Sequence, residues 1–156
     1  MISITKSLEH MAWSNQQIFK ALSELPEEIY GLRAAEGEWP VGRIVTHFLN
    51  AAEWYRYILT EIRWTDIEPI KSHEILRDSA VKLAEMDQVL IAQSLLSDDE
   101  ISFLNENGPD KTRRVVVLSQ ALSHTAEHKG QLATILKMHG FQLDLDALDH
   151  WTFVNI

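Results

Sequence analysis

The sequence contains no cysteine among its 156 residues. Disulfide bonds, thiolate metal ligands and a protein-borne thiol nucleophile are therefore excluded. Proline and glycine are also scarce, with four and six copies, so the composition is not that of a fibrous or disordered chain. What remains is an ordinary globular composition, 46% hydrophobic and 24% charged. At this length it predicts a single domain over residues 1–156.

Long hydrophobic runs are absent as well. No stretch reaches the about 18 consecutive apolar residues that a transmembrane helix needs. The N-terminal stretch MISITKSLEHMAW places Glu9 and His10 where a signal peptide has its apolar block. We therefore expect a cytoplasmic protein that has no membrane partner.

Positive charge is in short supply, since 14 lysines and arginines face 23 aspartates and glutamates and the formal net charge is −9. A nucleic-acid-binding surface needs a basic stripe that displaces counterions from phosphates. The densest basic cluster here is Lys111, Arg113 and Arg114, which is typical of a solvated hairpin or loop. The charge pattern predicts no nucleic-acid partner.

Hydrophobic residues recur at spacings of three and four in four segments, at about 3–23, 41–62, 72–94 and 116–138. Such spacing predicts helices. Residues 100–117 hold the sequence Asn-Gly-Pro-Asp between two short apolar runs, which indicates an extended arm or irregular hairpin. The tail after Gly140 is expected to form a short helix or turn that packs back. The predicted fold is all-α, a four-helix bundle with a long irregular or extended connection crossing before the last helix.

Two histidines, His124 and His128, lie four residues apart in the last helical segment, so they project from one helix face. The same face carries Val117, Ala121, Leu132 and Ile135. Both imidazoles are therefore expected to point into the bundle. His47 holds the equivalent inward position in the second segment.

Three converging neutral imidazoles would bind a divalent ion such as zinc or nickel and leave a position for water or substrate. The alternative is that each histidine is a hydrogen-bonded core residue, because one sequence does not show that the two helices are neighbours. The other four histidines are expected at the surface: His10, His73, His139 and His150.

Two other metal-site templates fail. The string HTAEH matches the inverted zinc-protease signature H-x-x-E-H, with Glu127 as the base, but the chain ends too soon after His128 to form a two-lobed protease. A di-iron bundle needs E-x-x-H on two helices. Glu53 is instead followed by Arg56 at that spacing, and Glu127 by Gly130.

The segment HTAEHKGQ, residues 124–131, resembles the motif H-x-x-x-H-[RK]-G-Q of the DinB/YfiT-like family of metalloenzymes. The pairing of His47 with Trp54 and the string Trp-Ser-Asn at 13–15 are similar to two further patterns of that family, so the resemblance spans nearly the whole chain. Lys129 stands where arginine is more common.

The resemblance implies an up-down-down-up four-helix bundle, often a homodimer, in which His47, His124 and His128 bind one nickel or zinc ion. It also implies a metal-dependent enzyme that activates a low-molecular-weight thiol cosubstrate for transfer to a small electrophilic substrate. Such a reaction needs no protein cysteine. The alternatives are a metal-dependent hydrolase on the same site and a non-catalytic, metal-binding dimeric module of a stress response.

Two polar residues next to the expected ligands are candidates for supporting roles. Glu127 would orient His124 or move protons, or else be a solvated surface residue. Gln131, one turn beyond His128, would support a ligand from outside the coordination sphere, or else pack at a dimer contact.

Overall fold

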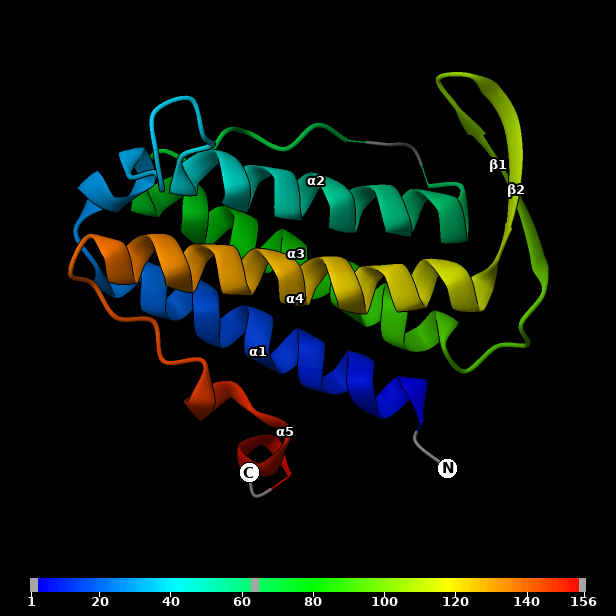
Figure 1. Cartoon of the computed structure of the whole chain (residues 1–156). Coiled ribbons are helices and arrows are strands. Elements are labelled where there is room, and N and C mark those ends of the chain that lie inside the picture. The colour runs from blue at the N-terminus through cyan, green and yellow to red at the C-terminus, as the bar shows by residue number, and fades with distance from the viewer. Residues whose placement is uncertain (1–2, 63–64, 155–156) are drawn as a thin grey trace.

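Four long helices dominate the computed structural model, which describes residues 3–62 and 65–154. They are α1 (Ile4–Glu24), α2 (Val41–Thr60), α3 (His73–Gln93) and α4 (Arg114–Met138). Figure 1 shows that α1 and α4 run in one direction and α2 and α3 in the other, which is an up-down-down-up order. The predicted all-α bundle is confirmed, and each helix begins and ends within two residues of its predicted bounds.

Helix ends follow from local chemistry. α1 ends before Pro26, because a residue that precedes proline is disfavoured in the helical conformation. α2 begins directly after Pro40. The hydroxyl oxygen of Ser72 accepts a hydrogen bond from the backbone N–H of Ile75 at the start of α3. Gly140 follows α4 at a φ of +82°, a left-handed conformation that glycine adopts without steric cost.

The described part of the connection between α2 and α3, residues 65–72, runs back along α2. The backbone N–H of Thr65 donates to Glu53 Oε1 at 3.0 Å, and that of Ile70 donates to Thr46 Oγ1 at 2.9 Å. Gly42 of α2 permits this close approach, because a Cβ at that position would lie 2.3 Å from the carbonyl oxygen of Ile70. This connection returns along the length of the bundle, and it makes α3 parallel to α2, its neighbour.

The segment before α4 is extended, as predicted, and it joins α3 to α4, which lie diagonally across the bundle because each of them packs on both α1 and α2. It forms an antiparallel hairpin of β1 (Glu100–Asn105) and β2 (Gly108–Arg113), which projects from the bundle end where α3 stops and α4 begins. A two-residue turn joins the strands, and Gly108 has a φ of +111° there. Short extended strands and a tight turn let α3 and α4 meet at one end.

Two hydrophobic clusters make up the core. One contains the fully buried Leu22, Leu49, Leu83 and Leu136, and the other contains Leu8, Leu90 and Leu118. Along α4, the last buried residue of the Leu8 cluster is Ala121, and the first buried residue of the Leu22 cluster is Leu132. Five buried polar residues of α1, α3 and α4 occupy this interval: Ser14, Asn15, Asp87, Thr125 and His128. A polar layer therefore divides the core near the middle of the bundle.

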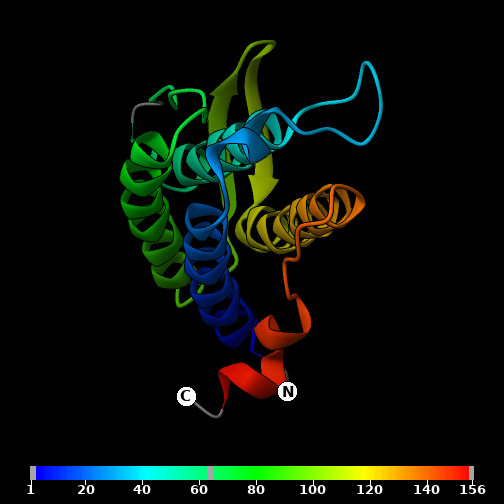
Figure 2. The same cartoon turned by 90° about the vertical axis from the view of Figure 1, so that its left-hand side faces the viewer.

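The C-terminal tail packs back on α1, as predicted. It contains a short 3₁₀ helix, η2 (Asp146–Leu148), and α5 (His150–Phe153), which lie below α1 and α4 in Figure 2. The rings of His10 and His150 stack with centroids 3.7 Å apart. A further 3₁₀ helix, η1 (Glu27–Gly31), follows α1. None of the described helices is long and apolar enough to span a membrane.

Candidate metal centre

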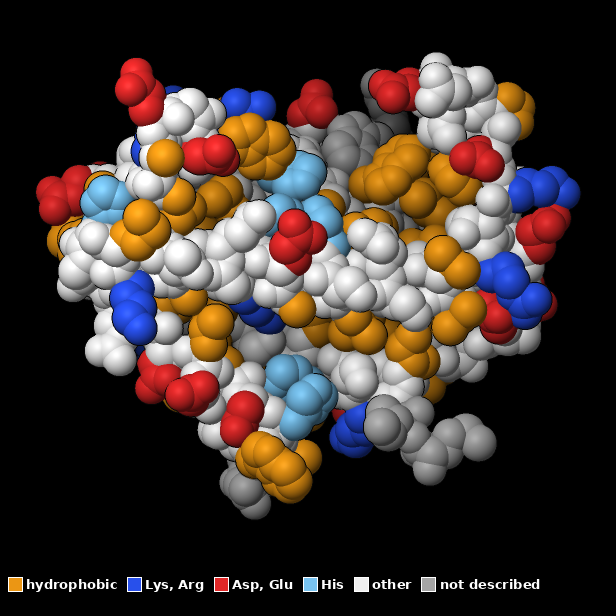
Figure 3. Space-filling model, viewed as in Figure 1, with side chains coloured by type: hydrophobic (Ala, Val, Ile, Leu, Met, Phe, Trp, Pro, Cys, Tyr) orange, Lys and Arg blue, Asp and Glu red, His pale blue; other side chains and the backbone are white. Residues whose placement is uncertain are grey.

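The structure brings together the three histidines that the sequence singles out. His47 extends from α2, and His124 and His128 extend from the facing side of α4. The Nε2 atom of His124 lies 3.2 Å from Nε2 of His47 and 2.9 Å from Nε2 of His128. His128 is buried, whereas His47 and His124 are partly exposed. Figure 3 shows pale blue histidine side chains reaching the surface between α2 and α4, with hydrophobic side chains on both sides.

These distances are those expected of nitrogens that share one ion. Two nitrogens each about 2.0–2.1 Å from an ion lie about 2.9 Å apart at a right angle and about 3.4 Å apart at a tetrahedral angle. Hydrogen bonds alone do not account for the cluster. Each Nε2 offers one in-plane proton or lone pair, so His124 Nε2 cannot bond both of its neighbours. The three residues therefore fit a divalent cation.

Gln131 fixes the orientation of His128. Its side-chain oxygen lies 2.7 Å from His128 Nδ1, so Nδ1 carries the proton and donates it to the amide oxygen. The lone pair of His128 is thereby left on Nε2, which faces the other two histidines. A polar partner of this kind sets the tautomer and direction of a metal-binding imidazole.

The surroundings favour the neutral form of His47 and His124. Burial, and then the charges of His128 and His47, lower the pKa of His124 to about 4. Burial also lowers the pKa of His47, and His128 is the next contributor. A metal ligand has to present a lone pair rather than a proton, so the low pKa values suit metal binding at neutral pH.

Glu127 lies beside the cluster but on the exposed face of α4. Burial dominates the pKa values of His47 and His124, and the negative charge of Glu127 opposes it by raising both. No hydrogen bond joins Glu127 to His124 among the residues that the structure describes. The link between them is thus electrostatic.

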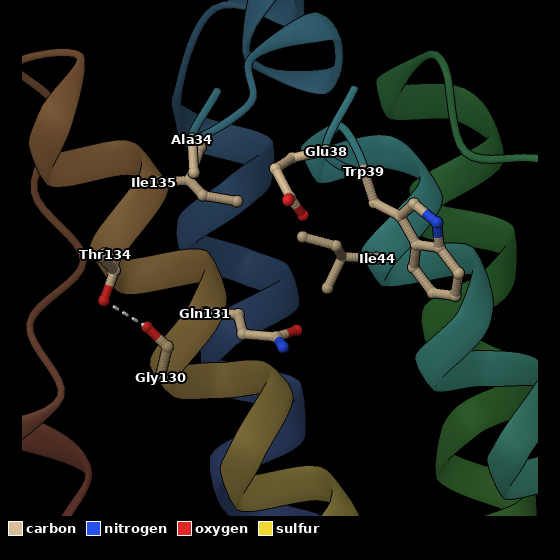
Figure 4. Close-up of a pocket in the computed structure, with 8 residues that line it drawn as sticks. All are labelled: Ala34, Glu38, Trp39, Ile44, Gly130, Gln131, Thr134 and Ile135. Carbon is tan, nitrogen blue, oxygen red and sulfur yellow. Dashed lines mark hydrogen bonds between the residues drawn. The ribbon is translucent and has the colours of Figure 1, made fainter. Parts of the chain in front are cut away.

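A cavity of about 460 Å³ adjoins the histidines between α2, α4 and the loop before α2. Figure 4 shows Glu38, Ile44 and Gln131 pointing into it. Gln131 contacts His128, and the indole of Trp39 meets the His47 ring nearly edge-on with centroids 5.1 Å apart. Gln131 and Trp39 therefore separate a small molecule in this cavity from the imidazoles of His128 and His47 by one layer of side chains.

The sequence did not single out Trp39; its only signal is a place next to Pro40, two turns before His47. The tryptophan that the sequence did single out in α2, Trp54, instead packs on the core cluster of Leu8 and stacks on Tyr57 with centroids 5.4 Å apart.

The polar layer continues behind His128. The side-chain amide of Asn15 donates to Asp87 Oδ2 at 2.9 Å, and the Lys129 ammonium donates to Ser14 Oγ. Burial raises the pKa of Asp87 to about 7, against the hydrogen bond from Asn15. Burial also lowers the pKa of Lys129 to about 8, although Asp87 opposes this. The motif lysine thus turns toward α1 rather than toward the histidine cluster.

Comparison with known proteins agrees with this architecture. A model of the DinB family matches residues 1–146, which is most of the chain. The chain belongs to the DinB family. It is 24% identical over 151 residues to Protein DinB of Bacillus subtilis (strain 168), covering 87% of this chain and 86% of that protein.

A solved structure supports the DinB fold. The crystal structure of a DinB-like protein from Bacillus cereus ATCC 10987 matches with a TM-score of 0.68 at 17% identity. The match covers 90% of this chain and 93% of the other. At this level of identity the likeness concerns the fold alone.

Proposed function

We propose that His47, His124 and His128 bind one divalent ion, nickel or zinc, and that the protein is a metal-dependent enzyme. In the proposed reaction a low-molecular-weight thiol is transferred to an electrophilic substrate. The observation that carries the proposal is the approach of His124 Nε2 to two other Nε2 atoms at 2.9 and 3.2 Å, beside a cavity. Membership of the DinB family supports it.

Different residues of this chain would contribute to different parts of such a reaction. A divalent ion held by three neutral imidazoles would keep its positive charge and so lower the pKa of a thiol beside it. The chain has no cysteine, so the thiol must come from solution. Gln131 holds His128 in one tautomer, and Trp39, Ile44 and Ile135 offer an apolar wall for the electrophile.

Glu127 is the candidate for moving the proton. Its carboxylate is exposed to solvent, and its charge acts on two of the three histidines. We propose that Glu127 Oε takes the thiol proton and passes it to water. The proton thereby leaves a site whose imidazoles have to stay unprotonated.

The test is a thiol-consumption assay on protein loaded with nickel or zinc. Glutathione, cysteine, bacillithiol and mycothiol are each supplied with monobromobimane, so that a sulfur–carbon bond forms, bromide leaves and the proton goes to solvent. We expect a rate above the uncatalysed reaction with at least one thiol, and its loss in His124→Ala. Turnover no faster than buffer with every thiol would reject the transferase.

Two alternative functions are tested alongside the transferase. Hydrolysis of p-nitrophenyl acetate without thiol, abolished by His124→Ala, would favour a metal-dependent hydrolase on the same site. Metal binding with neither activity would favour a non-catalytic module of a stress response. We also propose a homodimer in the cytoplasm, and sedimentation velocity measures the oligomeric state.

A further inference from the structure

A second hollow lies on the other side of α4, between α4, α1 and the C-terminal tail. Its volume is about 440 Å³, and it shares no lining residue with the cavity beside the histidines. Figure 3 shows it as a depression below α4, with a blue basic side chain inside and pale blue histidines at its rim. Among the residues that line it, the basic side chain is Lys129 and the histidines are His10 and His150.

Most of the groove wall is apolar. Met11 comes from α1, Leu122 and Ala126 come from α4, and Leu145 and Leu148 come from the tail. A chain of methylene groups would lie on such a wall without leaving a polar group unpaired.

The floor of the groove carries a cation with spare hydrogen-bonding capacity. An ammonium has three N–H donors. Lys129 donates to Ser14 Oγ, and that hydroxyl donates onward to the carbonyl oxygen of Met11 at 3.0 Å. The described residues provide no second hydrogen-bond acceptor for this ammonium. Desolvated donors without acceptors are costly, so an anionic oxygen at this position would be stabilising.

The charges around the groove favour a singly charged headgroup. Asp87 lies on the core side of Lys129 and interacts with it electrostatically. At the rim, Asp149 acts in the same way on His10. A doubly charged phosphate would bring more negative charge than one lysine balances, with Asp149 at the rim adding to it, whereas a carboxylate brings one charge. His10 also ties the tail to α1, since its Nε2 donates to the carbonyl oxygen of Leu148 at 2.7 Å.

We propose that this groove binds a small amphiphilic carboxylate. The carboxylate lies on the Lys129 ammonium, and its apolar chain follows Met11, Leu122 and Leu148 toward the tail. The site is distinct from the three histidines, so its occupancy does not depend on the metal.

The test is isothermal titration calorimetry with octanoate, octanol and octyl phosphate. We expect one molecule of octanoate to bind per chain, at least about tenfold more tightly than octanol, because only the carboxylate carries a negative charge that pairs with the Lys129 ammonium. Binding should weaken by a similar factor in Lys129→Met. Lys137→Met, an exposed lysine of the same helix, is the matched control and should bind as wild type does. His124→Ala, which alters the other site, should also retain binding.

Several results would overturn the proposal. No octanoate binding, equal affinity for octanol, or unchanged affinity in Lys129→Met each removes the role of the ammonium. Tighter binding of octyl phosphate than of octanoate would show that the groove prefers a phosphate headgroup, which contradicts the proposed carboxylate. Lys129→Met also removes the cation beside the buried Asp87, so Ala126→Phe is a second variant that fills the groove from an exposed position of α4. It should keep the helical circular dichroism spectrum and lose octanoate binding; retained binding would contradict the assignment.

Discussion

Replacing Gln131 by methionine isolates the contribution of a residue that supports the metal centre without belonging to it. The substitution keeps the length of the side chain and removes the oxygen that accepts the proton of His128 Nδ1 at 2.7 Å. Gln131 is exposed, so the fold does not depend on it. What changes is the tautomer and direction of one imidazole.

The expected loss of metal affinity follows from where this hydrogen bond lies, outside the coordination sphere. Removal of a partner outside the coordination sphere costs about 10–100-fold in metal affinity. A neutral hydrogen bond is worth about 0.5–1.5 kcal/mol, and water can reach Nδ1 from the exposed side of Gln131. We therefore expect the lower end, a loss of about tenfold, which corresponds to about 1.4 kcal/mol of binding free energy.

The assay is competition for zinc between the protein and a chromogenic chelator at pH 7. Gln88→Met, an exposed glutamine of α3 outside the cluster, is the matched control and should bind zinc as wild type does. A dissociation constant for Gln131→Met within about twofold of wild type would refute the reasoning that this amide orients a ligand.

Three further predictions concern the fold around the site. Gly42→Ala should lower the free energy of unfolding by about 1–3 kcal/mol in urea titrations, because the new methyl group would lie 2.3 Å from the Ile70 carbonyl oxygen; an unchanged midpoint would contradict this contact. Leu49→Ala, at a fully buried position of α2, should cost about 2–5 kcal/mol in the same measurement, and a cost under 1 kcal/mol would show that the site is not packed. Burial raises the pKa of Asp87 to about 7, so the folded protein keeps this carboxyl protonated at pH values where the unfolded chain has already lost the proton. The free energy of unfolding therefore falls as pH rises from about 4 to 7, by up to about 1.4 kcal/mol per pH unit. The stability of Asp87→Asn relative to wild type should therefore increase between pH 5 and 7, and a constant difference would refute the buried titration.

The helices were predictable because their signals are local. Hydrophobic spacing located all four, and Pro26, Pro40 and Gly140 marked three boundaries. The hairpin was predictable from its turn residues. The path of the α2–α3 connection was not, because residues 65–72 have no periodic pattern, and their path depends on contacts of their backbone with the side chains of Glu53 and Thr46.

The histidine cluster was predictable because His124 and His128 share a helix face and His47 lies on an inward stripe. That α2 faces α4 is a tertiary fact, and only the structure supplies the approach of His47 to His124. The hydrogen bond between Asn15 and Asp87 was predictable only in part. The position of Asn15 on the buried face of α1 predicted that its side chain has a hydrogen-bond partner, but no pattern in α3 identified Asp87 as that partner. Pairings between distant segments leave no local pattern to read.

The most direct test of the metal centre is the zinc and nickel stoichiometry of untagged protein, measured by calorimetric titration of wild type and of His→Ala variants from both helices. We predict about one ion per chain in wild type. His47→Ala on α2 and His124→Ala on α4 should each abolish tight binding, whereas His139→Ala, outside the cluster, should retain it. No tight binding in wild type, or binding that survives His47→Ala, would contradict a shared three-histidine site.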